Sequence, residues 1–267
     1  MKRQNNEWAL VTGASSGIGL EFCRRLAEKG TPLVMVSNQD AELHAAAEEI
    51  GRTYGVATLP LVVDLTLPDA CRRLEESIDS AGVDVATLIN NAGIFSFNYL
   101  TETPQGKIDA FLDLHARAVT HLSTAFARRF AARGGGRILN MSSMSCWMPM
   151  PGLAMYASTK AYIRVLSRAL HYEMRGSGVS VTVACPGGIA TDLFGLPRGL
   201  QRFAVRIGVL QTPEKFTRAA LKRMEKGRAQ YINGLLNRFS ILFIGCLPRG
   251  GRMLVRSRLL DKGVRKP

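Results

Sequence analysis

Residues 12–19 read TGASSGIG, and this stretch decides how the rest of the sequence is interpreted. It follows the apolar run Trp8–Thr12 and precedes an amphipathic pattern over Gly19–Lys29, so its glycines lie between a predicted strand and a predicted helix. Glycines let backbone N–H groups approach a pyrophosphate, which the positive end of the following helix then stabilises. The spacing is G-x-x-x-G-x-G rather than the general G-x-G-x-x-G, and an ordinary tight turn is the alternative interpretation.

Strand and helix signals alternate from this stretch to about Phe194. The predicted strands are Trp8–Thr12, Leu33–Ser37, Ala57–Leu65, Val85–Asn90, Arg137–Ser142 and Val179–Cys185. The predicted helices are Gly19–Lys29, Ala41–Arg52, Leu67–Ser80, Gln105–Arg133 and Ala154–Arg175. Most strands are continuous apolar runs, as expected for strands buried on both faces of a parallel sheet. The pattern predicts a single α/β domain with a doubly wound (Rossmann) parallel sheet, helices on both faces and an irregular basic C-terminal extension.

Composition excludes several classes of protein. The 267 residues are 46% hydrophobic and 21% charged, which is ordinary for a globular chain and argues against disorder. No apolar stretch is long enough to span a bilayer, and no secretory signal is visible. The five cysteines are scattered without C-x-x-C spacing, so the sequence predicts no metal site and a cytoplasmic location.

The net charge of +14 comes from one part of the chain. Residues 198–267 contain 17 basic and 3 acidic residues, whereas residues 1–197 contain 18 of each. A basic excess confined to the last quarter is not a property of the main fold, so we expect no nucleic-acid partner.

A second motif, YASTK at residues 156–160, carries the chemistry. Tyr156 and Lys160 are four residues apart on a predicted helix, so their side chains share one face. A nearby ammonium favours the phenolate, which would lower the pKa of Tyr156 and make it a proton donor and acceptor. Ser143 follows the fifth predicted strand, at the edge where open α/β sheets bind ligands, and could hold a substrate oxygen beside Tyr156. A surface Tyr–Lys pair is the alternative.

Together these motifs resemble those of the short-chain dehydrogenase/reductase family, over about residues 7–194. In chain order, the elements that carry the resemblance are residues 12–19, Asp64-Leu65, Asn90-Asn91-Ala92-Gly93, Ser143, Tyr156 with Lys160, and Pro186-Gly187 followed by Thr191. The resemblance implies an NAD(P)-dependent oxidoreductase that interconverts a secondary alcohol and a ketone by hydride transfer. It also implies a homodimer or homotetramer.

The resemblance assigns roles to individual residues. Ser143, Tyr156 and Lys160 are the expected catalytic residues. The expected cofactor-binding residues are Gly13, Ser15, Ser16, Gly17, Ile18, Gly19, Asn38, Asp64, Leu65, Asn90, Tyr156, Lys160, Ile189 and Thr191. Among these, Asp64 is expected to hold the adenine and Lys160 the nicotinamide ribose. Residues 1–194 would form the Rossmann-type cofactor-binding and catalytic core. Residues 195–267 would add the substrate loop, the last sheet element and the extension to the same domain.

Two positions depart from the family pattern. Where the family commonly has a proton-relay asparagine, this chain has His115, inside an apolar stripe of the long helix. It is a candidate catalytic residue because imidazole can pass a proton, and a core histidine is the alternative. Asn38 follows the second strand, where relatives carry arginine for NADP or an acidic residue for NAD, so the sequence leaves the choice between NAD and NADP open. We expect Asp40 to be a helix N-cap.

The substrate side is less informative. The segment SCWMPMP at residues 145–151 is rich in soft apolar side chains and by resemblance lines the pocket, which favours a bulky apolar alcohol or ketone, steroid-like or fatty-acyl. Ordinary packing is the alternative. Cys146 has no recognisable base nearby, so it is not expected to be a nucleophile.

The basic extension has several interpretations. Apolar residues beside an arginine cluster at Arg249, Arg252 and Arg256 are typical of peripheral contact with an anionic membrane, here the inner membrane surface. A solvated tail, a site for the phosphates of an acyl-thioester carrier, and a subunit interface are the alternatives. A non-catalytic NAD(P)-binding sensor or scaffold on the same fold is the alternative to the enzyme.

Overall fold

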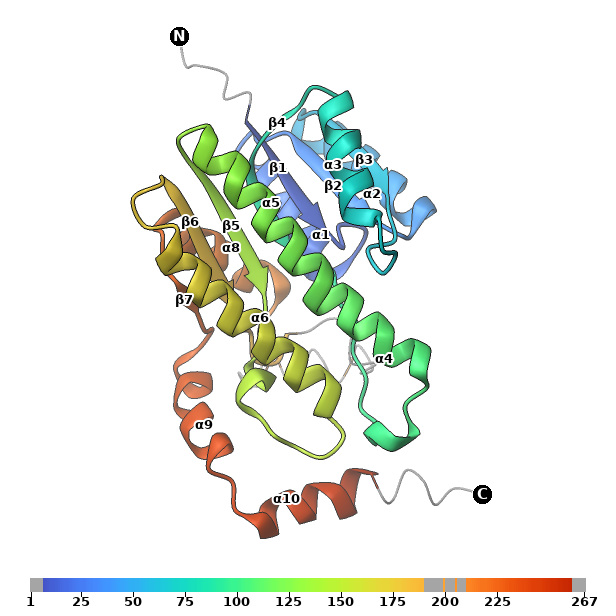
Figure 1. The fold of residues 1–267 in the computed structure, drawn as a ribbon, viewed down its shortest axis with the longest axis vertical. Helices are drawn as coiled ribbons and strands as arrows, with labels where there is room; N and C mark the ends of the chain where they lie inside the picture. Colours follow the sequence, from blue (N-terminus) through green and yellow to red (C-terminus); the bar gives the residue numbers. More distant parts are fainter. Residues whose placement is uncertain (1–6, 190–198, 200–204, 206–209, 261–267) are drawn as a thin grey trace.

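Seven parallel strands form one sheet in the order β3-β2-β1-β4-β5-β6-β7 (Figure 1). The computed structural model describes residues 7–189, 199, 205 and 210–260. The strands are β1 (Glu7–Thr12), β2 (Leu33–Ser37), β3 (Thr58–Val62), β4 (Asp84–Asn90), β5 (Gly136–Met141), β6 (Val179–Ala184) and β7 (Gln230–Tyr231). The chain leaves the sheet centre twice in opposite directions, so the predicted doubly wound sheet is confirmed.

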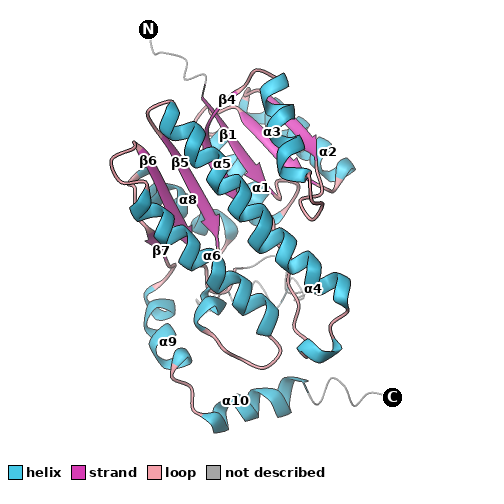
Figure 2. Ribbon diagram, in the orientation of Figure 1, coloured by secondary structure: helices cyan, strands magenta, loops and turns pink. Residues whose placement is uncertain are grey.

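Helices cover both faces of this sheet (Figure 2). They are α1 (Gly17–Ala27), α2 (Asp40–Tyr54), α3 (Ala70–Ser80), α4 (Gln105–Leu112), α5 (Val119–Ala132), α6 (Ala154–Glu173), α8 (Pro213–Glu225), α9 (Leu235–Gly245) and α10 (Arg249–Val255). One core layer joins α1, α2 and α8 to the sheet, and the other joins α3 and α5 to it. Along β1, Ala9 and Val11 belong to the first layer and Leu10 to the second, which explains the continuous apolar run.

The predicted helix over residues 105–133 is interrupted by a π-helical turn. This turn, Asp113–Ala118, joins α4 to α5 and contains His115. A π turn inserts one extra residue into the helix and rotates the following side chains, and such turns are frequent at functional sites. Sequence periodicity alone does not reveal it. The run of glycines at 134–136 ends the helix as expected, with Gly134 at φ +86°.

Two local predictions are wrong. The N-cap of α2 is Gln39, and Asp40 is the first helical residue, where its carboxylate contacts the His44 ring at 2.8 Å. In the described part of the C-terminal extension, the chain is helical (α9, α10 and a π-helical turn over Arg256–Leu260) rather than irregular. Within the described residues, no helix is both long and apolar enough to cross a membrane.

Candidate active site

The predicted site residues gather along one edge of the sheet. The loop at 13–16 follows β1, Asp64 lies beyond the end of β3, Asn90 ends β4, and Ser143 lies just beyond β5. These are the carboxyl ends of parallel strands, where ligands bind in open α/β sheets. The fold therefore brings together motifs that are up to about 130 residues apart in the sequence.

The glycine loop is packed too closely for side chains. A Cβ on Gly19 would lie 1.9 Å from the carbonyl oxygen of Gly13 and 2.5 Å from Nδ2 of Asn91. Gly13 has φ +66°, and a Cβ there would lie 2.9 Å from Cα of Ala92. The loop thus needs glycine at both positions, and its amides begin helix α1, as a cradle for a pyrophosphate requires.

Two polar residues of the quoted motifs that were not assigned as site residues, Thr12 and Asn91, hold this cradle. Oγ1 of Thr12 accepts hydrogen bonds from the N–H groups of Asn91 and Ala92, both at 3.0 Å. The side-chain amide of Asn91 donates to the carbonyl of Thr12 at 3.0 Å. These bonds therefore join the end of β1 to the residues that follow β4, next to the loop. In the sequence, the only sign of this contact is the pair of asparagines at residues 90–91.

The loop is also joined to the end of β2. Oγ of Ser15 lies 3.0 Å from Oγ of Ser37 and donates to Oε1 of Gln39 at 2.8 Å. Asn38 is exposed beside this group. Neutral side chains thus occupy the position where an acidic or basic residue selects between the two dinucleotides, so the structure also leaves that choice open.

The other predicted cofactor residues differ in what they offer. Asn90 is 4% exposed, and its amide donates to Asn140 at 2.8 Å, so only its backbone faces the sheet edge. Leu65 is buried in the core. One Asp64 oxygen accepts from the backbone and hydroxyl of Thr66, at 2.9 and 2.7 Å. Ile189 is buried and pairs with Gln211, whereas Thr191 lies outside the described residues.

Tyr156 and Lys160 lie side by side on α6. Nζ of Lys160 lies 5.7 Å from the centre of the Tyr156 ring and donates to the carbonyl of Met141 at 3.0 Å. The Ser143 hydroxyl interacts with the Tyr156 hydroxyl and favours its ionised form. Ser143 also accepts from the N–H of Ser145 at 3.1 Å, which fixes its hydroxyl at the start of a short 3₁₀ turn.

Burial controls the protonation of this pair. It raises the pKa of Tyr156 to about 12, against the opposing interaction with Ser143. It lowers the pKa of Lys160 to about 8. The predicted shift of the Tyr156 pKa toward neutrality is not seen in the protein alone. Burial destabilises the phenolate more than the neighbouring polar groups stabilise it. Tyr156 is accordingly a neutral phenol at pH 7, the form that donates a proton.

His115 is fully buried beside the pair. Its Nε2 accepts from the N–H of Ile94 at 3.1 Å, so the ring proton is on Nδ1, which lies 3.0 Å from Oγ1 of Thr159. The His115 and Tyr156 rings are 6.2 Å apart. Burial and the charge of Lys160 hold the pKa of His115 well below its ordinary value. These contacts are those of a neutral core histidine with both nitrogens bonded.

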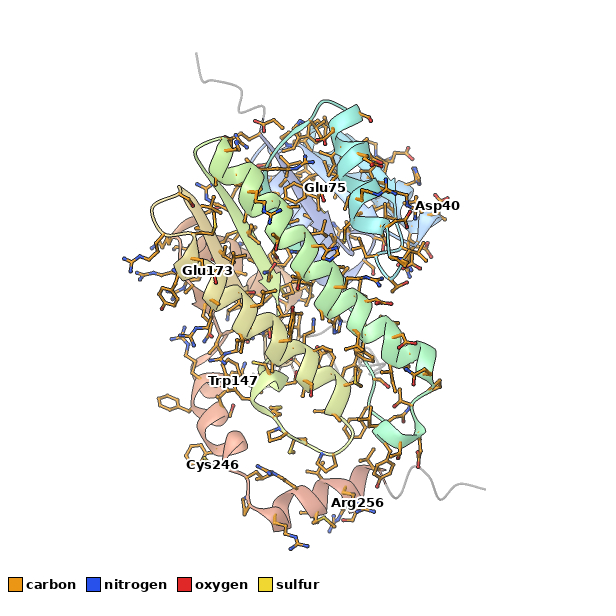
Figure 3. The ribbon with its side chains drawn as sticks, viewed as in Figure 1. Asp40, Glu75, Trp147, Glu173, Cys246 and Arg256 are labelled. Carbon is orange, nitrogen blue, oxygen red and sulfur yellow. The ribbon has the colours of Figure 1, made fainter. Side chains whose placement is uncertain are left out.

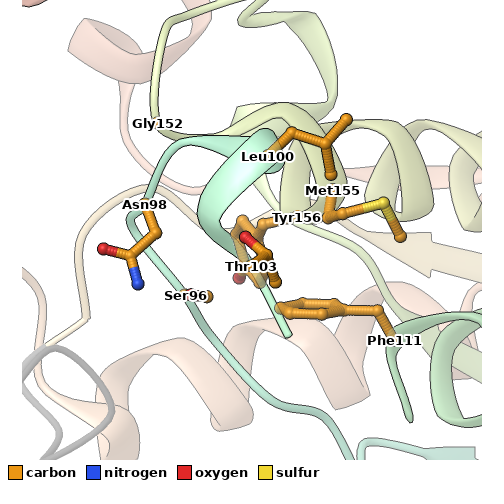
Figure 4. A pocket seen from close by; sticks show the side chains of 8 residues that line it. All are labelled: Ser96, Asn98, Leu100, Thr103, Phe111, Gly152, Met155 and Tyr156. Carbon is orange, nitrogen blue, oxygen red and sulfur yellow. The ribbon is translucent and has the colours of Figure 1, made fainter. Parts of the chain in front are cut away.

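A small pocket adjoins Tyr156 (Figure 4). Its lining residues are Ser96, Asn98, Leu100, Thr103, Phe111, Gly152, Met155 and Tyr156. The Phe95 ring also packs edge-on against Tyr156, 5.0 Å away. The segment after Asn90-Asn91-Ala92-Gly93, which carries no motif, therefore forms this wall.

Residues 145–151 do not line this pocket. Trp147 instead packs against β6 and stacks on Arg164 of α6, 4.4 Å from the guanidinium carbon. Cys146 packs against the cluster that contains Cys185, and its interaction with Cys185 lowers the pKa of the Cys146 thiol. Of the two interpretations given for this segment, pocket lining and ordinary packing, the structure shows ordinary packing for Trp147.

Comparison with known proteins agrees with this geometry. The profile of short chain dehydrogenases matches residues 7–197. A 7beta-hydroxysteroid dehydrogenase of Collinsella aerofaciens is 30% identical over 90% of this chain and 91% of its own. The very-long-chain 3-oxoacyl-CoA reductase of Bos taurus is 30% identical over 81% of this chain and 68% of its own. A short-chain dehydrogenase from Sphingobium yanoikuyae, solved in complex with NADPH, superposes with a TM-score of 0.77 at 29% identity, covering 95% of this chain and 96% of that one.

Among the described residues, no three potential metal ligands come together, and the polar groups at the sheet edge are those of a dinucleotide site. Both the matched profile and the relatives extend over most of the chain. The chain therefore belongs to the short-chain dehydrogenase family, the NAD(P)-dependent oxidoreductases that act on alcohols and ketones.

Proposed function

We propose that the protein reduces a ketone on a bulky apolar substrate, steroid-like or fatty-acyl, to a secondary alcohol, with the reverse oxidation at the same site. The observation that carries this proposal is the buried Tyr156, which adjoins Lys160 and lines a pocket at the edge of the sheet. The names of the steroid and very-long-chain acyl relatives support the substrate class.

Each residue has a definite task in this proposal. The glycine loop, Asp64 and Lys160 would hold the nicotinamide cofactor, which when bound would supply the hydride. The hydroxyl of Ser143 positions the substrate oxygen, and the neutral phenol of Tyr156 gives that oxygen its proton. The buried Lys160, fixed by the Met141 carbonyl, orients the ribose and favours the phenolate that remains.

A cofactor screen tests this function. Purified protein is incubated with NADPH or NADH and, in turn, a ketosteroid, a 3-oxoacyl thioester and cyclohexanone, and loss of absorbance at the nicotinamide band is followed. We expect turnover of at least one bulky ketone. Tight cofactor binding without turnover of any of them would favour the sensor or scaffold alternative.

Replacing His115 with asparagine is expected to lower thermal stability without changing the pH dependence of the rate. The buried ring makes two hydrogen bonds, and losing one typically costs about 1–3 kcal/mol. Burial and the charge of Lys160 keep the pKa of His115 well below its usual range, so we expect no ionisation of His115 in the rate profile at neutral pH. The check is a kcat/KM profile of both proteins. An ionisation near ~6.5 that disappears in the variant would instead establish a relay role.

A second prediction concerns the C-terminal segment, which packs beside Gly152 of the pocket wall. Nε of Arg256 donates to the Tyr99 hydroxyl at 3.2 Å, and Leu260 is 5% exposed, 3.1 Å from where a Cβ on Gly152 would lie. The space within the pocket is about 10 Å³, room for about one water. A bulky ketone therefore enters only if the pocket widens, and we expect the C-terminal segment beside Gly152 to be the part that moves.

Arg256→Ala should accordingly raise kcat/KM for a ketosteroid relative to cyclohexanone, by about two- to fivefold, the effect of an exposed cation–π contact. Arg258→Ala, an exposed arginine two residues away, is the matched control. Equal substrate ratios in the two variants would contradict the role of the Arg256–Tyr99 contact.

We also propose two partners beyond the substrate. One is a second copy of the chain, in a homodimer or homotetramer, which light scattering tests. The other is an anionic membrane surface, which the protein would contact peripherally through its basic C-terminal region while otherwise remaining in the cytoplasm.

A further inference from the structure

A hollow with a basic lining lies away from the active site, between α8 and the start of α9. Its volume is about 470 Å³, and four of its lining side chains are cationic: Lys222, Arg223, Lys226 and Arg238. In Figure 1, α9 lies below the β7 edge of the sheet, and α8 lies behind the sheet. This hollow involves none of the residues assigned above to cofactor or substrate.

The four cations have no acidic partners in the part of the chain that the structure describes. None of the ion pairs formed there includes them. The two acidic residues of α8 pair elsewhere, Glu214 with Arg25 and Glu225 with Lys29. Four like charges around one hollow produce a strong positive potential, which favours an anion.

Exposed aromatic side chains adjoin these charges. Phe239 and Phe243 are 62% and 75% exposed, and they lie four residues apart on one face of α9, directly after Arg238. Met253 and Leu254 of α10, also about half exposed, lie further along the chain. Arg256 follows at the C-terminal end of α10 (Figure 3). Large apolar side chains bordering a cationic surface are typical of proteins that lie in the headgroup region of a membrane.

We propose that this surface docks on anionic phospholipid, with lipid phosphates in the basic hollow and Phe239 and Phe243 inserted among the acyl chains. The inference rests on the proposed membrane contact and supplies its site. A small soluble phosphate would use the cations but not the exposed rings. A second copy of the chain is disfavoured at this face, because a two-fold interface would bring the same four positive charges together.

Vesicle co-sedimentation of the full-length chain tests the proposal. We expect binding to phosphatidylcholine vesicles that contain phosphatidylserine, little binding to pure phosphatidylcholine, and loss of binding at high salt. Lys222→Gln with Lys226→Gln should lower the partition coefficient about 30-fold, as expected for two basic residues near an anionic leaflet. Phe239→Ser should lower it about 10-fold.

The control is Arg52→Gln with Lys107→Gln, which removes two exposed charges from α2 and α4. It should leave binding within about twofold of the wild type, since these charges lie outside the docking surface. An equal loss in the control would show that only net charge matters and would overturn the site.

Two other outcomes would also overturn it. If the wild type stays in the supernatant with anionic vesicles at low salt, both the proposed membrane contact and the proposed docking surface are wrong. If inorganic phosphate at matched ionic strength displaces the protein and Phe239→Ser has no effect, the hollow is a site for small anions. Circular dichroism and cofactor titration of each variant confirm that it is folded, and turnover does not enter the measurement.

Discussion

Tyr156→Phe is expected to lower kcat for ketone reduction at least ~10²-fold while leaving fold and cofactor affinity intact. Phenylalanine fills the same buried space, so no cavity forms and the edge-on packing with the Phe95 ring is kept. What is lost is the phenolic hydroxyl that lines the pocket and interacts with Ser143. The measurements are steady-state kinetics on a ketone found in the screen, thermal melting and NADPH titration.

The matched control for this variant is Tyr162→Phe on the same helix. Tyr162 is 43% exposed, and its hydroxyl contacts Thr120 at 2.8 Å, away from the pocket. It should keep turnover within about twofold, the ordinary range for a surface change. Near-native turnover in Tyr156→Phe would show that the proton comes from another group.

Gly19→Ala should raise the Kd of NADPH and of NADH at least ~10-fold, because overpacking at this position costs more than 1 kcal/mol. The added Cβ would lie 1.9 Å from the Gly13 carbonyl oxygen, so the loop must open to accommodate it. The same movement would separate the loop from the Asn91 side chain, and we expect it to lower the melting temperature. Fluorescence titration and thermal melting measure the two effects.

Gly106→Ala is the control, because a Cβ there meets no atom within 4 Å and the residue lies on an exposed helix. We expect unchanged cofactor affinity and equal or slightly higher stability, since alanine favours helix. If Gly19→Ala bound both dinucleotides as tightly as the wild type, residues 13–19 would not be the pyrophosphate cradle.

Local patterns were sufficient for the architecture. Continuous apolar runs such as Leu33–Ser37 predicted strands buried on both faces, and the glycines after β1 marked the first turn. The edge of the sheet that binds ligands could also be predicted. Strands that alternate with helices run parallel, so their carboxyl ends lie along the same edge. A last sheet element was expected within residues 195–267, and β7 is that element. Its position was not predicted, since two residues carry no periodic signal.

The chemistry at the site depended on burial, which the sequence does not contain. The YASTK motif places a lysine beside a tyrosine, and from that pattern a lowered tyrosine pKa was expected. In the folded chain the surroundings exclude water, so the pKa of Tyr156 rises and that of Lys160 falls. A motif specifies which groups are neighbours, whereas the solvation of each group depends on everything packed around it.

The sequence by itself determined the family and the order of the motifs along the chain, and it supplied the side chains that we propose react. These features are encoded in residues close together in the chain or in their order along it. Only the tertiary structure decided that His115 has both ring nitrogens bonded, that Trp147 packs away from the pocket, and that residues 96–103 form its wall. It also gathered the cations of α8 and Arg238 into one hollow. Such contacts join segments whose separation in the sequence gives no sign of their distance in space, because they arise from how helices pack on the sheet.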